Sequence, residues 1–140
     1  MADMHTKEIR SYNMSRIRSK DTKPEMMVRK FLHKNGFRYR LHVKNLPGKP
    51  DIVLPKYKTV IFIHGCFWHA HEKCRYAVMP KTNTGYWSKK ISGNVSRDFL
   101  AKELLQKLGW KEIVLWECDL RKLNFEITMK KVVDHLRNFY

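Results

Sequence analysis

The chain has 140 residues, which fits one domain with a substantial hydrophobic core, and it contains neither an internal repeat nor a low-complexity tract. Its 29 Lys and Arg against 13 Asp and Glu residues give a net charge of +16, which indicates a folded surface for a polyanion such as DNA, although a merely solvated basic face has the same composition. No apolar run approaches the ~20 residues of a membrane span and the N-terminus lacks the apolar core of a signal peptide, so we expect an intracellular, cytoplasmic protein with no membrane contact.

The first predicted element is a helix over residues 24–35. Thr22 and Glu25 have the spacing of a capping box, Pro24 suits the first turn, and Gly36 marks the end. Apolar and basic side chains then alternate from residue 37 to residue 41, which predicts a strand with one basic face. The proline- and glycine-rich sequence LPGKP breaks this pattern.

Two apolar runs follow, and they predict strands that are covered on both faces. The remaining expected elements are a loop, a short basic helix, a longer helix, a strand and a terminal helix. The strands are expected at 51–54 and 58–63, the loop at 80–85, the helices at 86–91 and 94–108, the fourth strand at 110–116 and the last helix at 126–139. This order predicts an α/β protein with a mixed central sheet and helices on its faces.

A cluster of metal-binding residue types follows the third predicted strand directly. The sequence HGCFWHAHEKC at 64–74 holds two cysteines and three histidines, and a third cysteine is Cys118. Three cysteines cannot all pair within one chain, so metal binding is favoured over disulfides. Because Asp51 opens the neighbouring apolar run, a carboxylate is expected beside this cluster. The layout indicates a metal-dependent nuclease.

Four separated segments resemble one known family. They are LPGKPD at 46–51, VIFIHGCFWH at 60–69, NVSRD at 94–98 and LWEC at 115–118. In this order they resemble the very short patch repair (Vsr) DNA mismatch endonucleases, and HGCFWH is highly specific. The resemblance extends from Ala2 to the last strand. It implies a single restriction-endonuclease-like domain of the PD-(D/E)xK type over residues 1–140, in which Phe62 and His64 replace the usual acid and lysine, as is typical of the family.

The resemblance also implies an activity. This is a Mg²⁺-dependent, strand-specific nick next to the T of a T:G mismatch, left by deamination of 5-methylcytosine, which begins very short patch repair. We expect a monomer that binds double-stranded DNA, is associated with the nucleoid when bound, and is functionally linked to a cytosine-5 DNA methyltransferase and repair proteins. Two alternatives are a non-catalytic, zinc-stabilised module for distorted DNA and a nuclease of the same fold that cuts intact duplex.

By the same resemblance, three residues contribute to a magnesium site. Asp51 and the main-chain carbonyl of Ile63 bind the ion, and Glu25 reaches it through water. Asp51 has an alternative role in satisfying the amides of a turn, and Glu25 has one as a helix cap.

Three further residues are expected to act on the phosphate and the attacking water. His69 resembles the family's general base, His64 resembles its second active-site histidine and stabilises phosphate charge, and Asp98 orients His69. His69 has an alternative role as a zinc ligand, and Asp98 has one as an acid near a helix N-terminus.

A structural zinc site is expected from Cys66, His71, Cys74 and Cys118. Such a Cys₃His set suits a closed tetrahedral Zn²⁺ with no position for substrate. The family commonly has one residue fewer before the second cysteine, which changes the local path of the loop. Alternatively, Cys118 is a small buried hydrophobe and His71 is an exposed loop residue.

Aromatic residues next to these sites complete the predicted DNA contacts. The resemblance implies that Phe67, Trp68 and Trp87 insert into the base stack beside the mismatch, although each aromatic taken alone is more often a core residue. Residues 1–20 are expected to contact DNA, with Met14 and Ile17 in the minor groove. Trp110 and Trp116 are predicted to belong to the core.

Overall fold

The structure is a computed structural model that describes residues 21–138. Over these residues the chain forms one helix, three strands, a second helix, a fourth strand and a final helix, as the sequence predicts. The elements are α2 (Lys23–Lys34), β1 (Arg40–Leu41), β2 (Ile52–Leu54), β3 (Thr59–His64), α3 (Thr84–Lys107), β4 (Lys111–Trp116) and α4 (Phe125–Asn138), with the short 3-10 helices η1 (Pro55–Tyr57) and η2 (Glu117–Leu120).

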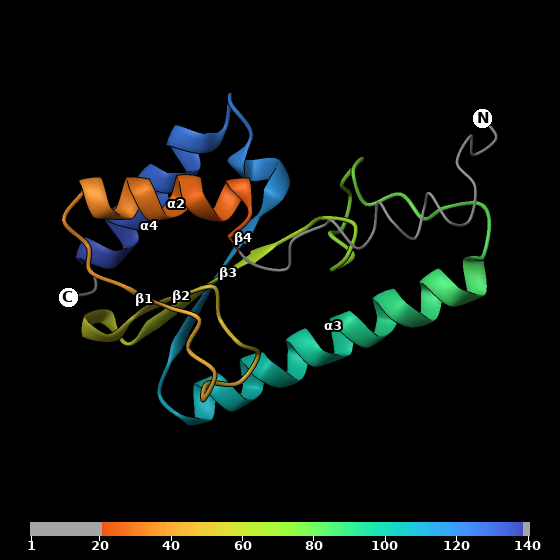
Figure 1. The fold of residues 1–140 in the computed structure, drawn as a ribbon, viewed down its shortest axis with the longest axis horizontal. Coiled ribbons are helices and arrows are strands. Elements are labelled where there is room, and N and C mark those ends of the chain that lie inside the picture. Colours follow the sequence, from red (N-terminus) through yellow and green to blue (C-terminus); the bar gives the residue numbers. More distant parts are fainter. Residues whose placement is uncertain (1–20, 139–140) are drawn as a thin grey trace.

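The four strands form one mixed sheet in the order β1-β2-β3-β4. Strand β2 is antiparallel to both β1 and β3, and a tight turn through η1 joins β2 to β3. Strands β3 and β4 are parallel, so the chain must cross over between them, and α3 forms that crossover (Figure 1). The parallel register pairs His64 with Trp116 at the carboxyl ends of both strands. The predicted mixed sheet is therefore confirmed.

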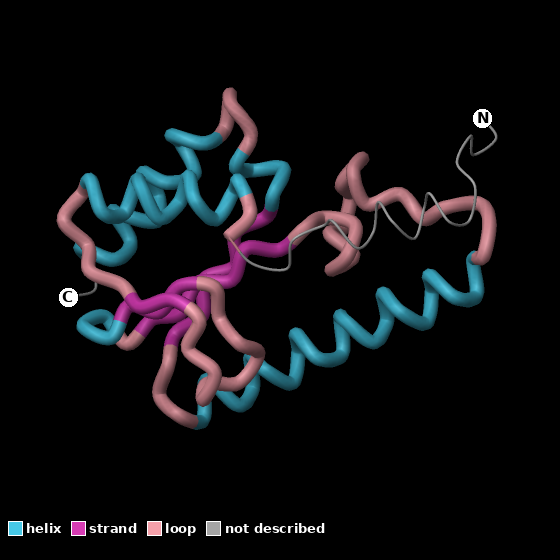
Figure 2. Tube along the Cα trace, viewed as in Figure 1, coloured by secondary structure: helices cyan, strands magenta, loops and turns pink. Residues whose placement is uncertain are grey.

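Helices cover both faces of this sheet, so the molecule has three layers (Figure 2). Helices α2 and α4 lie together on one face and α3 crosses the other. Because the side chains of a strand alternate between faces, Ile61 packs in the cluster beneath α2 and α4, whereas Val60 and Phe62 pack with Leu105 of α3. The same alternation puts His64 on the α3 side, where the site described below lies.

Helix α3 is one continuous helix where the sequence predicts two. The predicted loop extends to residue 85 and the predicted break falls at 92–93, but the helix starts at Thr84 and runs through Gly93 without interruption. A glycine inside a helix costs about 1 kcal/mol relative to alanine. Burial of Ile91 before the glycine and of Leu105 after it offsets that cost. None of the helices among the described residues is long and apolar enough to cross a membrane.

The first predicted strand is shorter than expected. Only Arg40 and Leu41 pair with β2, and Phe37 is buried in the larger apolar cluster instead of extending the strand. Apart from the two predicted helices that merge into α3, the other predicted helices and strands agree with the structure to within one or two residues at each end.

Candidate active site

Two carboxylates meet where β2 begins. Asp51 is fixed by β3, because its backbone N–H donates to the Ile61 carbonyl at 3.1 Å and its Oδ2 accepts the Ile63 N–H at 2.7 Å. Burial raises the pKa of Asp51 to about 7, and the nearby Glu25 carboxylate adds to the rise, although the Ile63 hydrogen bond opposes it. Two acids so close together and shielded from water favour a shared proton or a bound cation. The chemistry of this pair therefore fits a divalent cation.

Glu25 reaches Asp51 from the first turn of α2. Its Oε2 accepts hydrogen bonds from the Asp21 backbone N–H at 2.8 Å and from Arg29 at 3.1 Å, while Thr22 Oγ1 accepts the Glu25 N–H at 3.4 Å. Glu25 therefore takes part in capping α2 and also lines the cleft, so the two expected roles are compatible. Arg29, which no sequence motif marks as part of the site, is buried and also pairs with Asp21 at 2.8 Å. Its guanidinium balances part of the negative charge.

A close approach of backbone to α3 holds the loop before Asp51. Gly48 has a φ of +77°, and a Cβ atom added there would lie only 2.7 Å from the Cβ of Ala101 and 3.0 Å from the Phe62 ring. Any other side chain would push this loop away from the helix and strain the backbone. The glycine therefore lets Asp51 lie on a cleft that α3 also lines.

His69 and Asp98 form a second pair on this cleft. His69 Nδ1 and Asp98 Oδ2 are 2.6 Å apart, and because a carboxylate only accepts, Nδ1 is the ring nitrogen that donates; in the neutral imidazole this leaves Nε2 as an acceptor. Asp98 comes from the face of α3 that also carries the buried Ala101. The His64 ring stacks on His69 at 3.8 Å and 6°, and burial together with His69 lowers the pKa of His64 to about 4. His64 is therefore neutral at pH 7.

The stacking excludes one interpretation of this group. Donor atoms of His64, His69 and Asp98 lie within 4.8 Å of one another, close enough to suggest a metal site. A metal ion lies in the plane of each imidazole that binds it, and two parallel planes 3.8 Å apart cannot both contain it. The arrangement instead suits a base with an orienting acid.

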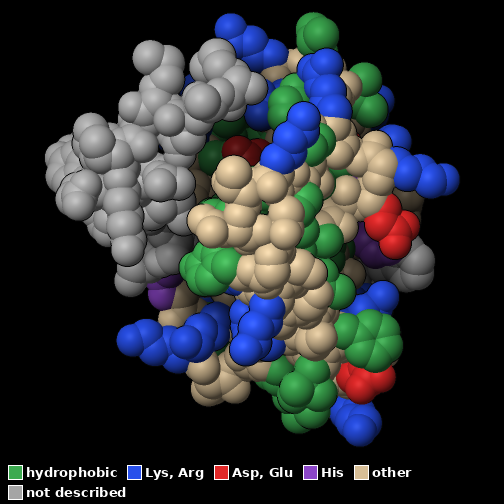
Figure 3. Space-filling view, turned by 90° about the vertical axis from the view of Figure 1, so that its right-hand side faces the viewer, with side chains coloured by type: hydrophobic (Ala, Val, Ile, Leu, Met, Phe, Trp, Pro, Cys, Tyr) green, Lys and Arg blue, Asp and Glu red, His purple; other side chains and the backbone are tan. Residues whose placement is uncertain are grey.

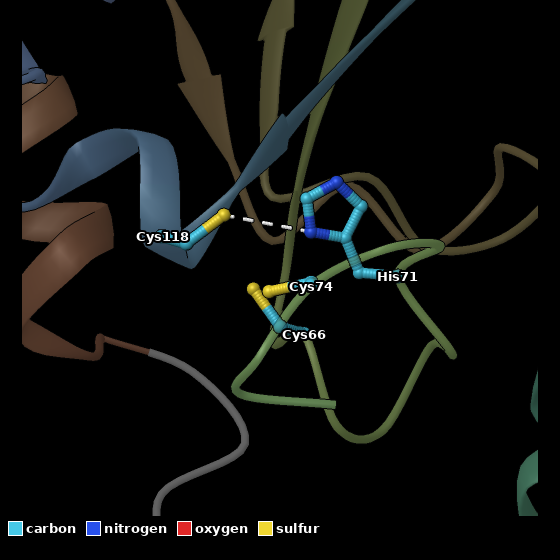
Figure 4. Close-up of side chains that lie close together, drawn as sticks. All are labelled: Cys66, His71, Cys74 and Cys118. Atoms are coloured by element: carbon cyan, nitrogen blue, oxygen red, sulfur yellow. Dashed lines mark hydrogen bonds between the residues drawn. The ribbon is translucent and has the colours of Figure 1, made fainter. Parts of the chain in front are cut away.

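Four other residues have the geometry of a metal centre (Figure 4). The donor atoms of Cys66, His71, Cys74 and Cys118 all lie within 4.8 Å of one another, and the Cys118 Sγ is 3.4 Å from the His71 Nδ1. Cys118 comes from η2 and the others from the loop after β3. Burial and the neighbouring Cys66 thiol raise the pKa of Cys118 to about 12, so a cation is needed to hold it as a thiolate. The Cys₃His donor set fits Zn²⁺, and it includes His71, not His69.

Three aromatic side chains form a half-exposed cluster at the rim. The centroid of the Phe67 ring lies 5.1 Å from that of Trp68 and 5.4 Å from that of Trp87, while the two tryptophans are 5.8 Å apart. Phe67 and Trp68 come from the loop after β3, and Trp87 comes from the first turn of α3. The structure thus brings together the three residues predicted to insert into DNA, and Tyr86 adds a fourth ring at 5.1 Å from Trp87.

One cleft of about 620 Å³ is lined by both the Asp51–Glu25 pair and the His69–Asp98 pair. The residues that line it come from α2 and its N-cap, the loop before β2, β3, the loop after β3, α3 and η2. They are Thr22, Pro24, Glu25, Gly48, Lys49, Asp51, Phe62, Ile63, His64, Gly65, Trp68, His69, Lys90, Asn94, Asp98 and Glu117.

Comparison with known proteins identifies the family. The family model described as DNA mismatch endonuclease Vsr matches residues 2–75. The chain is 54% identical over 121 residues to the type II nicking enzyme V.NmeAIP of Neisseria meningitidis, covering 86% of each chain, and 45% identical over 121 residues to the DNA mismatch endonuclease Vsr of Escherichia coli, covering 86% of this chain and 77% of that one. It is also 45% identical over 135 residues to the type II nicking enzyme V.XorIIP of Xanthomonas oryzae, covering 96% and 98%.

The chain belongs to the Vsr family. The expectation of an endonuclease is confirmed by this membership. The segment NVSRD at 94–98 makes a contact that no sequence pattern predicts, in which Asn94 Nδ2 donates to the Trp68 carbonyl at 2.9 Å. This bond ties the HGCFWH loop to α3. The spacing of Lys90, Asn94 and Asp98, four residues apart along a helix, is the signal that identifies all three as neighbours on one face.

The prediction for one tryptophan of this Vsr-family protein is wrong. Trp116 is expected in the core, but it is only half-buried and its ring contacts His71 and His64. Parallel pairing with His64 puts it on the α3 side of the sheet, a position that strand alternation alone does not reveal. Trp110 does pack against the smaller apolar cluster, as predicted.

The basic charge of the chain is spread around the rim of this end of the molecule. Figure 3 shows Lys and Arg side chains distributed over this face, with few acidic ones among the described residues. Such a surface suits a polyanion. Met14 and Ile17, and the whole segment 1–20, lie outside the described residues.

Proposed function

We propose that this Vsr-family endonuclease nicks one DNA strand next to the T of a T:G mismatch that arises from deamination of 5-methylcytosine, in a Mg²⁺-dependent reaction that starts very short patch repair. The observation that carries the proposal is the single cleft that holds the Asp51–Glu25 pair, the His69–Asp98 pair and an edge of the aromatic cluster. A non-catalytic DNA-binding module needs neither pair. The names of the relatives, a DNA mismatch endonuclease and nicking enzymes, support single-strand cleavage.

Asp51 and the main-chain carbonyl of Ile63 would hold the magnesium ion, with Glu25 acting through water. The raised pKa of Asp51 supports this assignment, because a buried acid beside a second acid is relieved by a cation. When bound, the ion supplies stabilisation of negative charge on the phosphate.

His69 acts as the general base. Its Nδ1–H is held by Asp98, so its Nε2 accepts the proton from water as the water oxygen bonds to phosphorus and the bond from phosphorus to the leaving sugar oxygen breaks. Asp98 stabilises the imidazolium that forms, as an orienting carboxylate does in other proton-transfer sites. Neutral His64 donates to the phosphate and leaves no second positive charge beside that imidazolium.

The aromatic cluster provides mismatch selectivity. Phe67, Trp68 and Trp87 are half-exposed and already in contact, so they can enter the base stack as one wedge. A mismatched step costs less to open than a paired step, and a wedge converts that difference into preference. Met14 and Ile17, which are flanked by Arg16 and Arg18, are expected to enter the minor groove from the other side.

The Cys₃His set holds a structural Zn²⁺ that fixes the loop carrying this wedge. We further infer a restriction-endonuclease-like fold of PD-(D/E)xK type and a monomer acting on double-stranded DNA. The chemistry of the lesion implies a link to a cytosine-5 DNA methyltransferase and to repair proteins that fill the gap.

The test is a nicking assay with zinc-loaded protein on end-labelled duplexes that differ only by T:G or T:A. We expect a nick in the T strand of the T:G duplex that requires Mg²⁺ and is absent in Asp51→Ala. Equal cutting of both duplexes would point to a general nuclease. Tight binding without a nick across varied flanking sequences would point to a non-catalytic DNA-binding module.

A further inference from the structure

Trp116 lies between the two centres of the molecule. Its indole is stacked on the His71 ring with centroids 4.1 Å apart and planes at 8°, and it makes an edge contact with the His64 ring at 5.2 Å and 75°. His64 in turn stacks on His69. Four rings therefore form an unbroken series from the Cys₃His set to the base that Asp98 holds.

The backbone fixes both ends of this series. Trp116 is the last residue of β4 and pairs in register with His64, and Cys118 follows two residues later in η2. The indole thus lies at the end of a strand that pairs with β3, directly before the segment η2, which contributes a donor to the Cys₃His set. A shift of that set would move the indole directly.

Packing, more than hydrogen bonding, orients His64. Its buried Nδ1 has no hydrogen-bond partner among the described residues, and its Nε2 is 4.0 Å from the nearest Asp98 oxygen, which is too long for a hydrogen bond. The ring is instead enclosed by Trp116 on one side, Phe62 at 5.7 Å and the stacked His69. Loss of the indole would open a void beside His64 and free both stacked imidazoles to tilt.

We propose that Trp116 is a positioning residue that holds His64 and His69 in line and couples them to the Cys₃His set. His71 strengthens the coupling, because an imidazole polarised by a bound cation is attracted to the electron-rich face of an indole. The proposal rests on the proposed function for the role of His69, but its geometric part does not depend on the substrate.

The test compares Trp116→Leu with Trp116→Phe and with Trp110→Leu. Trp110 is a matched control, because it is also half-buried but lies just before the other end of β4, where it packs against the smaller apolar cluster. We expect Trp116→Leu to retain zinc and to bind T:G duplex in Mg²⁺-free buffer within about 3-fold of wild type, while its single-turnover nicking rate falls by about 10- to 100-fold. Trp116→Phe should recover most of the rate, and Trp110→Leu should leave it within about 3-fold.

A second readout needs no nicking. The downfield proton resonance of the His69 Nδ1–H, which the 2.6 Å contact with Asp98 should produce, is expected to broaden or disappear in Trp116→Leu and to persist in Trp110→Leu. An unchanged resonance and rate in Trp116→Leu would overturn the proposal, as would equal losses in both leucine variants. A wild-type protein that shows the resonance but does not nick would instead contradict the proposed function alone.

Discussion

The two candidate metal centres differ in how completely the chain builds them. The Cys₃His set supplies four donors from the protein, enough for a closed tetrahedral site, whereas the acid cluster offers only the Asp51 and Glu25 carboxylates. The first centre crosslinks η2 to the loop after β3, so metal there stabilises the fold. The second brings two carboxyl groups together away from water, a pairing that a bound cation would relieve. The first centre thus fits a closed structural site, and the second fits a site that leaves positions for water or substrate.

Breaking the closed centre should have the largest effect. In Cys118→Ser we expect loss of one zinc equivalent and a fall in stability of more than about 3 kcal/mol, because the link between η2 and the loop disappears. Metal analysis and thermal melting measure both quantities. Cys74→Ser should behave in the same way. Full zinc content in either variant would contradict the assignment.

Breaking the open centre should have the opposite effect on stability. Asp51→Asn is expected to abolish Mg²⁺-dependent nicking and, in Mg²⁺-free buffer at pH 8, to raise stability by up to about 4 kcal/mol. Folding raises the pKa of Asp51 from 3.8 to about 7, so the folded protein keeps a proton that the unfolded chain releases between these values. Wild-type stability from this group is therefore full below about pH 4 and is lost as pH rises to 7.

Urea unfolding of zinc-loaded protein at pH 5 and pH 8 would reveal this slope. Mg²⁺ should restore stability to the wild type at pH 8 but not to Asp51→Asn. Because the asparagine oxygen still accepts the Ile63 N–H, an Asp51→Asn variant less stable than wild type at pH 8 would mean that the stronger hydrogen bond to a charged carboxylate outweighs the cost of the buried charge.

Substitutions in the His69–Asp98 pair should lower the nicking rate without changing zinc binding. We expect His69→Ala to lower the nicking rate by about 10²- to 10⁴-fold and Asp98→Asn to lower it less, because the asparagine still accepts from the ring but does not stabilise its positive charge. Single-turnover kinetics measure the losses. Zinc content should stay at wild-type level, since His71 completes the Cys₃His set. Zinc loss in His69→Ala would contradict the assignment of His71 to zinc and of His69 to the reaction.

The smallest effects separate the two roles of the first turn of α2. Thr22→Ala removes the side-chain cap on the Glu25 N–H and should cost about 1 kcal/mol, with nicking within about 3-fold because Arg29 still holds the carboxylate. Glu25→Gln retains the cap but loses the charge, so a higher Mg²⁺ concentration should be needed for half-maximal nicking. Equal Mg²⁺ requirements in the two variants would argue that Glu25 is only a cap.

The sequence predicted much of the fold because the decisive signals were local. Thr22 and Pro24 mark the start of α2 and Gly36 follows its end, and the apolar runs of β2 and β3 are close to continuous. The break predicted near Gly93 was wrong because a local glycine penalty of about 1 kcal/mol is smaller than the packing energy of the helix on the sheet. Tertiary structure decides such cases.

The candidate site divides in the same way. Motif residues such as Asp51, His69 and Cys66 were identified from the sequence because their residue types and spacing are distinctive. Arg29 and Trp116 were missed, since a basic residue in a basic chain and a tryptophan at a strand end carry no local signal. Their positions follow from the ion pairs around Glu25 and from the parallel register of β3 and β4.

The uninterrupted course of α3 has a consequence for where the chain can cut. Trp87 and Asp98 are eleven positions apart on one rigid helix, which is about 16 Å along its axis. Under the proposed function, the helix would hold the aromatic cluster and the His69–Asp98 pair at a fixed separation. The spacing between distortion and nick would then be set by helical geometry, and a single inserted residue between them would turn one end by about 100° relative to the other.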